Sequence, residues 1–441
     1  MQNQNNIIVI SMACAAAGAA CDARAGGFML QEQSQLEIGR AFSGGAAAAD
    51  DPSTIFYNPA GMTELPGIQI ATGATALFID SHQRDLGSTI TRTTSVPLGP
   101  FPTFSSPIPI SGGNGGNPFA PVVPVPTTYA SAQIGQSRLW LGFGLSAPFG
   151  LKLRYAPDFV GRYNSTYSNM LTLNAQPSFA WRVNNSLSIG GGLDIQYADV
   201  TLEGAMPSAA AGGSDTKAKL SGDDIALGWN AGVLLKLDGG LRIGLHYRSQ
   251  VKHDLKGKSE LSGFSGALSG LNGSTPIRSP LTLPGSITAS ISFPLDSKTR
   301  FMATGRHYNW SVFDKLRVVF PDGTVSAKDY QYRDSWSLSA GLEHVRSDRL
   351  TLRAGAMFDR TPTNPAFLST RVPDGDRSWL STGLSYRLSP HLTLNASYAH
   401  VFIEKQTLVR TESFFGPVAV DYRLQSSGNV DMLATSVTAR F

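Results

Sequence analysis

The sequence predicts an all-β protein, a closed antiparallel barrel of about fourteen strands that spans a membrane. Three observations predict it. Amphipathic segments follow one another from Ile68 to Phe441, their connections are alternately short and long, and the chain ends on an aromatic residue. In membrane barrels the turns on the assembly side are short and the loops on the other side are long. A closed barrel is also the only β-structure that satisfies every backbone amide in lipid.

The period-two alternation is clearest in residues 187–197, 241–248, 350–359 and 433–441. In 241–248 the odd-numbered residues are apolar, whereas the even-numbered ones are Arg242, Gly244, His246 and Arg248. A soluble β-sandwich would show the same alternation with its apolar face turned inward, so alternation alone leaves the solvent on each face open. The secretory leader, the ordered connection lengths and the terminal Phe441 favour the barrel. A terminal Phe is the usual signal read by the bacterial barrel-assembly machinery, which we expect as a partner.

The connections form two sets. The short set, which we expect to face the periplasm, lies near residues 135–138, 184–186, 238–240, 294–298, 346–349 and 389–391. Long connections alternate with these, are rich in Gly, Ser, Pro and Asn, and are expected to face outward. The long set includes residues 81–126, 203–222 and 256–281.

Composition agrees with one barrel domain, residues 67–441. The chain has 441 residues with 46 Gly, 15% charged residues and a mean hydropathy of −0.07. Apart from the leader, no run reaches the ~18 uncharged apolar residues of a spanning helix. The net charge of +4 is spread along the chain, so nucleic acid is not suggested as a partner. The seven histidines are scattered and neither HExxH nor a Cys cluster is present, so we expect no metal and no cofactor.

Residues 1–25 are typical of a signal peptide. Residues 7–20 are apolar, and Ala23, Arg24 and Ala25 fit a cleavage site with small residues at both ends. Two features depart from this pattern, because residues 1–6 lack Lys and Arg, and Cys21 has a weak lipoprotein-like context. A misassigned start codon and lipidation therefore stay open. Both cysteines lie in this leader, and a mature chain without thiols suits an oxidising periplasm and the Gram-negative outer membrane.

Residues 26–66 precede the first strand and are too rich in Ala and Gly to be another barrel strand. They contain Gly-Phe-Met-Leu at 27–30, Gly-Arg-Ala-Phe-Ser-Gly-Gly-Ala at 39–46, Ala-Asp-Asp at 49–51 and Asn-Pro-Ala-Gly-Met at 58–62. Further motifs lie at 146–151, 161–163, 358–362 and 373–380. With these motifs the chain resembles the FadL/TodX (OmpP1) family of outer-membrane transporters. The resemblance implies that residues 26–66 are a hatch plugging a fourteen-stranded barrel, with Asn58, Pro59 and Ala60 in its motif. We expect Asp50 and Asp51 to hold Arg40 or a strand arginine.

The resemblance implies passive uptake of long-chain fatty acids or other hydrophobic compounds, including aromatic and aliphatic hydrocarbons. The ligand would bind between outer loops, enter a lumen pocket, pass a moving hatch and leave sideways through a kinked third strand. Pro148 cannot donate to a ladder, so we place the kink at Ser146, Ala147, Pro148, Phe149 and Gly150. The apolar residues predicted for the outer groove are Leu261, Phe264, Leu268 and Leu271.

In the pocket, the resemblance assigns ligand contacts to Phe28 and Lys328, although Lys328 also fits a solvated loop lysine. A family Arg appears here as Asp199, which would repel a carboxylate and therefore favours a neutral hydrocarbon. Fatty acids stay open, since Arg154, Arg162, Arg242 or Arg317 would also supply a positive charge.

Two other classes compete with this prediction. An open diffusion porin would not need residues 26–66, and an outer-membrane lipase would need a nucleophile, a base and an orienting group together. No spacing links His246, His400, Ser385 and Asn395 in that way, so no enzyme is predicted. We expect a monomer in contact with outer-membrane lipid and lipopolysaccharide.

Overall fold

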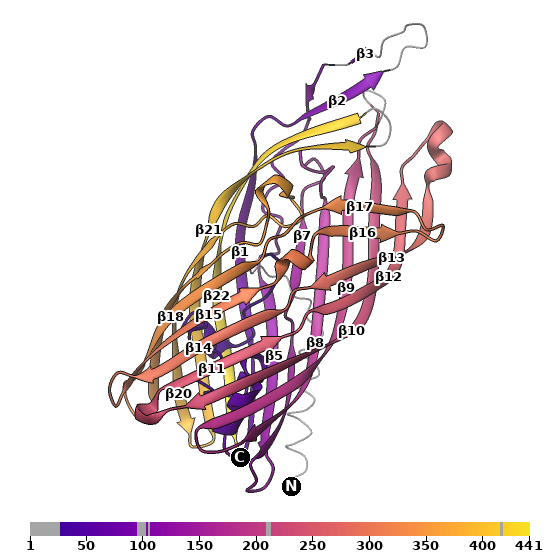
Figure 1. The fold of residues 1–441 in the computed structure, drawn as a ribbon. Coiled ribbons are helices and arrows are strands. Elements are labelled where there is room, and N and C mark those ends of the chain that lie inside the picture. The colour runs from indigo at the N-terminus through magenta and orange to yellow at the C-terminus, as the bar shows by residue number, and fades with distance from the viewer. Residues whose placement is uncertain (1–26, 95–102, 105, 209–212, 415–417) are drawn as a thin grey trace, which may run out of the picture.

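A closed antiparallel barrel of 14 strands surrounds the N-terminal part of the chain (Figure 1). The computed structural model describes residues 27–94, 103–104, 106–208, 213–414 and 418–441, and the predicted signal peptide lies outside them. The first and last strands, β1 (Ile68–Asp85) and β22 (Val418–Arg440), pair from Gln69 opposite Arg440 upward and close the barrel.

Most barrel strands are continuous, and some are divided into two segments. Besides β1 and β22, the continuous strands are β5 (Val123–Gln133), β8 (Tyr167–Arg182), β9 (Leu187–Met206), β10 (Thr216–Lys236), β19 (Leu350–Asp359), β20 (Arg377–Ser389) and β21 (Leu392–Phe414). The divided strands are β6 (Leu139–Ser146) with β7 (Gly150–Arg154), β11 (Arg242–Arg248) with β12 (Val251–Ser262), β13 (Gly273–Leu283) with β14 (Ser286–Pro294), β15 (Thr299–Tyr308) with β16 (Lys315–Val319), and β17 (Val325–Asp329) with β18 (Ser335–Val345).

The remaining elements are short. Three strands follow β1: β2 (Thr89–Thr94), β3 (Thr103–Phe104) and β4 (Ile108–Pro109). The helices are α2 (Gln35–Ile38), α3 (Thr54–Tyr57), η2 (Pro59–Glu64), η3 (Asp238–Gly240), η4 (Gly266–Leu271), η5 (Trp310–Val312) and η6 (Pro365–Phe367). Among the described residues, no helix has the length and apolar character needed to cross a membrane.

The predicted alternation is present with its apolar face outward. On β10, Ile225 and Leu227 are 67% and 69% exposed, whereas Ala226 between them and Asn230 are buried. On the neighbouring β9, Asp194 is buried in the lumen. An apolar exterior around a polar interior is the reverse of a soluble sandwich and is what a barrel in lipid requires. The fold prediction is therefore confirmed.

The short connections lie where predicted, but two of the long ones are shorter than expected. β9 runs to Met206 and β10 begins at Thr216, so most of the predicted loop 203–222 is strand. Likewise β12 and β13 reduce the predicted loop 256–281 to residues 263–272. Cross-strand pairing satisfies the backbone groups of these polar segments, and this outweighs their weak strand propensity.

Residues 27–66 form an N-terminal segment that fills the lumen. Its main chain reaches the barrel wall on several sides, where Gly44 donates to Thr304 over 2.8 Å and Ala46 donates to Ser290 over 3.1 Å. At Gly232 on β10 a Cβ atom would lie 2.0 Å from Oδ1 of Asn58, so the close approach of the segment requires glycine there. The segment is thus packed against the wall rather than hanging free.

Charged groups tie the segment to the wall at the end with short turns. Asp50 binds Arg40 and the strand residue Arg300, each over 2.6 Å. Arg300 also binds Glu343 over 2.7 Å, and Glu343 binds Arg353 over 2.7 Å. We expected Asp50 and Asp51 to hold Arg40 or a strand arginine, and this expectation is confirmed for Asp50. Asp51 instead accepts hydrogen bonds from Ser53.

Candidate functional site

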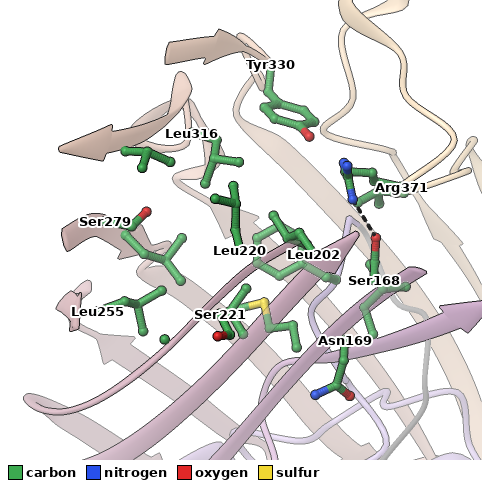
Figure 2. Close-up of a pocket in the computed structure, with 18 of the residues that line it drawn as sticks. Ser168, Asn169, Leu202, Leu220, Ser221, Leu255, Ser279, Leu316, Tyr330 and Arg371 are labelled. Carbon is green, nitrogen blue, oxygen red and sulfur yellow. Dashed lines mark hydrogen bonds between the residues drawn. The ribbon is translucent and has the colours of Figure 1, made fainter. Parts of the chain in front are cut away.

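An apolar pocket lies in the lumen between the N-terminal segment and the outer halves of several strands (Figure 2). Strands β7, β8, β9, β10, β12, β13 and β16 contribute to it, together with Phe28 and residues near 371 in the β19–β20 connection. Its volume is about 90 Å³. Most of the lining is aliphatic, as shown by Leu202, Leu220, Leu255 and Leu316 in Figure 2. Such a space suits an apolar ligand.

Phe28 closes one side of the pocket within an aromatic cluster. Its ring lies edge-on to Trp310, with ring centroids 4.7 Å apart, and edge-on to Phe313 at 5.4 Å. Phe149 and Tyr332 are next, at 6.2 and 6.4 Å. Aromatic contacts of this kind add about 0.5–1.5 kcal/mol beyond simple burial. The cluster therefore fixes the start of the N-terminal segment beside the pocket.

The third strand is broken where the sequence places its kink. β6 ends at Ser146 and β7 begins at Gly150, and both pair with β8, so residues 147–149 interrupt one continuous strand position. The N-terminal segment forms hydrogen bonds with backbone groups at this break. The N–H of Leu30 donates to the carbonyl oxygen of Pro148 over 2.8 Å. The side chain of Gln33 bonds both the N–H and the C=O of Ala147. Segment and kink are thus held together.

A second cavity, of about 250 Å³, lies at this break between β5 and β8. It is lined by residues on both sides of the sheet, including Thr127, Ser146, Ala147, Leu173 and Ile195. Leu173 and Ile195 belong to the outward faces of β8 and β9. The break therefore coincides with a hollow in the barrel wall.

Arg371 is the cation of the pocket, and the sequence analysis missed it. Its Nη1 donates to the carbonyl oxygens of Glu203 at 3.1 Å and Tyr167 at 3.3 Å. It also lies 3.5 Å from Oγ of Ser168, the contact drawn as a dashed line in Figure 2. Within the described ranges no carboxylate lies within ion-pair distance of this guanidinium. Burial lowers the pKa of Arg371 from its ordinary value. No local pattern in the sequence would have identified an arginine from this loop.

Lys328 lies outside the pocket lining and has a partner of its own. Its Nζ binds Glu412 over 2.8 Å, and Glu412 also accepts from Asn164 over 3.0 Å. The four arginines that the sequence analysis considered as alternative cations are also absent from the pocket lining. Arg162 binds Asp215, Arg242 binds Glu64, Arg317 binds Asp314, and Arg154 stacks on Tyr167.

Asp199 faces away from the lumen, which corrects the sequence argument against a carboxylate. On β9 the even-numbered residues Asp194, Gln196 and Ala198 are buried, whereas Leu193 and Ile195 are exposed. Asp199 lies on the same side of the strand as Leu193 and Ile195, is half-buried and accepts a hydrogen bond from Asn169 over 3.1 Å. Its charge therefore lies on the outer surface, where it does not repel a ligand in the pocket.

The residues predicted for the outer groove and the hatch motif occupy different places. Leu261 is the penultimate residue of β12, whereas Phe264, Leu268 and Leu271 lie in the β12–β13 connection. The structure brings none of the four into the pocket lining. Asn58 caps η2 by accepting from Ala60 over 3.1 Å, and it donates to Ala46 and Val233. Pro59 begins η2. In the described ranges no group of three or more His, Cys, Asp or Glu is arranged to hold a metal.

Comparison with known proteins agrees with this architecture. A family model described as outer membrane protein transport protein (OMPP1/FadL/TodX) matches residues 16–441. Outer membrane protein P1 of Haemophilus influenzae is 28% identical, covering 96% of this chain and 97% of that protein. A long-chain fatty acid transport protein of Escherichia coli O6:H1 is also 28% identical, covering 98% of both chains.

Solved structures share the fold. The crystal structure of a Pseudomonas aeruginosa FadL homologue superposes with a TM-score of 0.83 at 23% identity, covering 94% of this chain and all of the other. The Ralstonia pickettii toluene transporter TbuX gives a TM-score of 0.65 at 17% identity, with 92% and 98% covered. The chain therefore belongs to the OMPP1/FadL/TodX family, whose members are transport channels and not enzymes, and it is a Gram-negative outer-membrane transporter of fatty acids or other hydrophobic compounds.

Proposed function

We propose that this transporter takes up hydrophobic compounds that carry a carboxylate, with long-chain fatty acids as the substrate class. The observation that carries the proposal is Arg371, a half-buried guanidinium without a carboxylate partner among the described residues, at the edge of an apolar pocket. Backbone carbonyls accept hydrogen bonds from this guanidinium but do not neutralise its charge, which is costly to shield from water without an anionic partner. A ligand carboxylate would supply the missing partner, while its chain contacts Leu202, Leu220 and Leu316.

The apolar part of the ligand supports the same assignment. Burial contributes about 0.8 kcal/mol per methylene, so a long chain gains most of its affinity from the aliphatic lining. Several curated relatives are named long-chain fatty acid transport proteins, which agrees with this substrate class. The toluene transporters share the fold at lower identity, and a neutral hydrocarbon would leave Arg371 unpaired.

The proposed route begins with the pocket and ends at the break in the third strand. A cavity of about 90 Å³ is smaller than the ~300 Å³ at which ligand pockets commonly begin, so a long chain requires neighbouring side chains to move. Phe28 is part of the lining and its segment is bonded to the break, which couples an arriving ligand to residues 147–149. We infer that residues 26–66 act as the hatch and that the ligand leaves sideways past Pro148 into lipid.

Equilibrium binding to the detergent-solubilised protein tests the substrate class. Palmitate, hexadecanol and toluene are compared at neutral pH for the natural protein, Arg371→Met and Arg371→Lys. We expect Arg371→Met to weaken palmitate binding by about tenfold or more, because a charge-assisted bond is worth roughly 1.5–3 kcal/mol. Hexadecanol, which has no carboxylate, should bind the natural protein and Arg371→Met equally well. Arg371→Lys should bind palmitate more tightly than Arg371→Met does.

Lys328→Met is the matched control, since it removes a nearby cation that already has Glu412 as its partner. If Lys328→Met and not Arg371→Met weakens palmitate binding, the carboxylate is bound at the residue that the family resemblance indicated. If neither variant affects palmitate and toluene competes fully, the substrate is a neutral hydrocarbon.

A further inference from the structure

A patch of basic side chains lies on the outer surface of the barrel, away from the lumen. It consists of Lys219 on β10, Lys252, Lys256 and Lys258 on β12, and Arg278 on β13, which we call the basic patch. All five belong to the outward-facing sets of their strands. On β10 the exposed apolar side chains of Leu227 and Ile225 lead directly to the charged part of the strand. The basic patch therefore adjoins the apolar belt on the side of the long loops.

Two cations of the basic patch face each other across a strand pair. Lys256 and Arg278 are directly opposite one another on the paired strands β12 and β13. Like charges directly opposite one another destabilise a sheet. Asp254 compensates Arg278, whereas Lys256 has no ion-pair partner among the described residues and is available to an anion from outside the chain.

The protein's own carboxylates neutralise only part of the basic patch. Glu260 binds both Lys258, over 2.9 Å, and Lys219, over 3.3 Å. Asp254 accepts from Nε of Arg278 over 3.2 Å. Asp223 on β10 lies opposite Lys256 on β12, but no ion pair joins the two side chains. Within the described part of the chain, Lys252 and Lys256 have no ion-pair partner. Two exposed lysines are thus free to bind an anion.

We propose that the basic patch binds the phosphate groups of a phosphorylated glycolipid in the outer leaflet, as in lipopolysaccharide. The position fits a lipid: the acyl chains would lie on the apolar belt while the phosphates reach Lys252 and Lys256. Lysine stems lie along apolar surface and extend the ammonium to the polar boundary. Each Lys or Arg near an anionic lipid surface strengthens binding to that surface. A soluble anion would contact the lysines but not the adjoining apolar belt.

The experiment uses the full-length protein in detergent and measures lipid binding by native mass spectrometry. Bisphosphorylated lipid A is compared with its dephosphorylated form and with phosphatidylglycerol. The variant is Lys252→Gln with Lys256→Gln, which removes no ion pair of the protein. The control is Lys298→Gln with Arg346→Gln, which removes two exposed charges from the short turns at the other end. Heat-modified gel mobility verifies that each barrel is folded.

We expect the double lysine variant to bind bisphosphorylated lipid A about tenfold or more weakly, in line with two lysines at about 1 kcal/mol each. The control variant should bind as the natural protein does, and the dephosphorylated lipid should bind weakly to all three. Equal binding of lipid A by the natural protein and the lysine variant would overturn the proposal. So would equal binding of phosphatidylglycerol, which would make the basic patch a general anionic-lipid surface.

Discussion

Gly150 donates its backbone N–H to the carbonyl oxygen of Phe28 over 2.9 Å, which joins the restart of the third strand to the beginning of the N-terminal segment. Met29 and Phe149 form an antiparallel bridge beside it. The broken strand is therefore completed by the segment in the lumen. The same residue, Phe28, lines the apolar pocket, so a ligand that displaces its ring also disturbs the contact at the break.

Phe28→Ala should release the start of the N-terminal segment. Loss of a buried Phe side chain costs about 3–5 kcal/mol, and the aromatic cluster with Trp310 and Phe313 is lost with it. We expect faster hydrogen exchange at the amides of Leu30 and Gly150 and weaker palmitate binding. Phe358→Ala, which removes a lipid-facing ring, is the control and should leave both measurements unchanged.

Pro148→Ala should slow uptake while ligand binding stays normal. Alanine restores a backbone donor and lets the third strand continue across residues 147–149, which would close the hollow between β5 and β8. Uptake into cells and binding to purified protein are measured in parallel. A Gly150→Val variant tests the same break by adding a larger side chain at the start of β7. Full uptake by both variants would rule out lateral exit at this break.

Asp50→Asn should loosen the N-terminal segment at the end with short turns. The substitution removes the carboxylate shared by Arg40 and Arg300, which keep Glu37 and Glu343 as partners, and loss of a charge-assisted hydrogen bond costs about 1.5–3 kcal/mol. Protease cleavage within residues 27–66 and ion conductance in planar bilayers should both increase. Asp348→Asn, in an exposed turn, should behave as the natural protein does. Unchanged conductance in Asp50→Asn would show that other contacts hold the segment.

Glu32 should make docking of the N-terminal segment dependent on pH. Both of its carboxylate oxygens are buried and have no hydrogen-bond partner in the described part of the chain, and burial raises its pKa to about 8. An acid whose pKa is raised in the docked state stabilises that state fully below its free value near 4.5 and loses this contribution as pH rises through about 8. Hydrogen exchange in residues 28–33 should therefore accelerate between pH 5 and pH 9.

Glu32→Gln keeps the shape and removes the titration. Its exchange rates, corrected for the intrinsic effect of pH, should stay constant over the same range. A natural protein with equally constant corrected rates would mean that Glu32 does not control docking.

The sequence by itself determined the barrel, because a side-chain period of two is a local property that needs no knowledge of distant contacts. It also located the break at Pro148, since a missing backbone donor is fixed by residue type. The same alternation assigns Asp199 to the outward set together with Leu193 and Ile195. The argument from the family resemblance placed Asp199 in the pocket instead, and the structure contradicts it.

Only the tertiary structure decided the composition of the pocket. Arg371 reaches it from the connection between β19 and β20, and Lys328 is held by Glu412, a residue of another strand. The lengths of β9, β10, β12 and β13 beyond the apolar belt were also decided by pairing between strands. In each case the deciding interaction joins residues distant in the sequence, so no local pattern encodes it. Short-range periodicity fixes which face a strand residue lies on, whereas packing of loops and neighbouring strands fixes which charges remain unpaired.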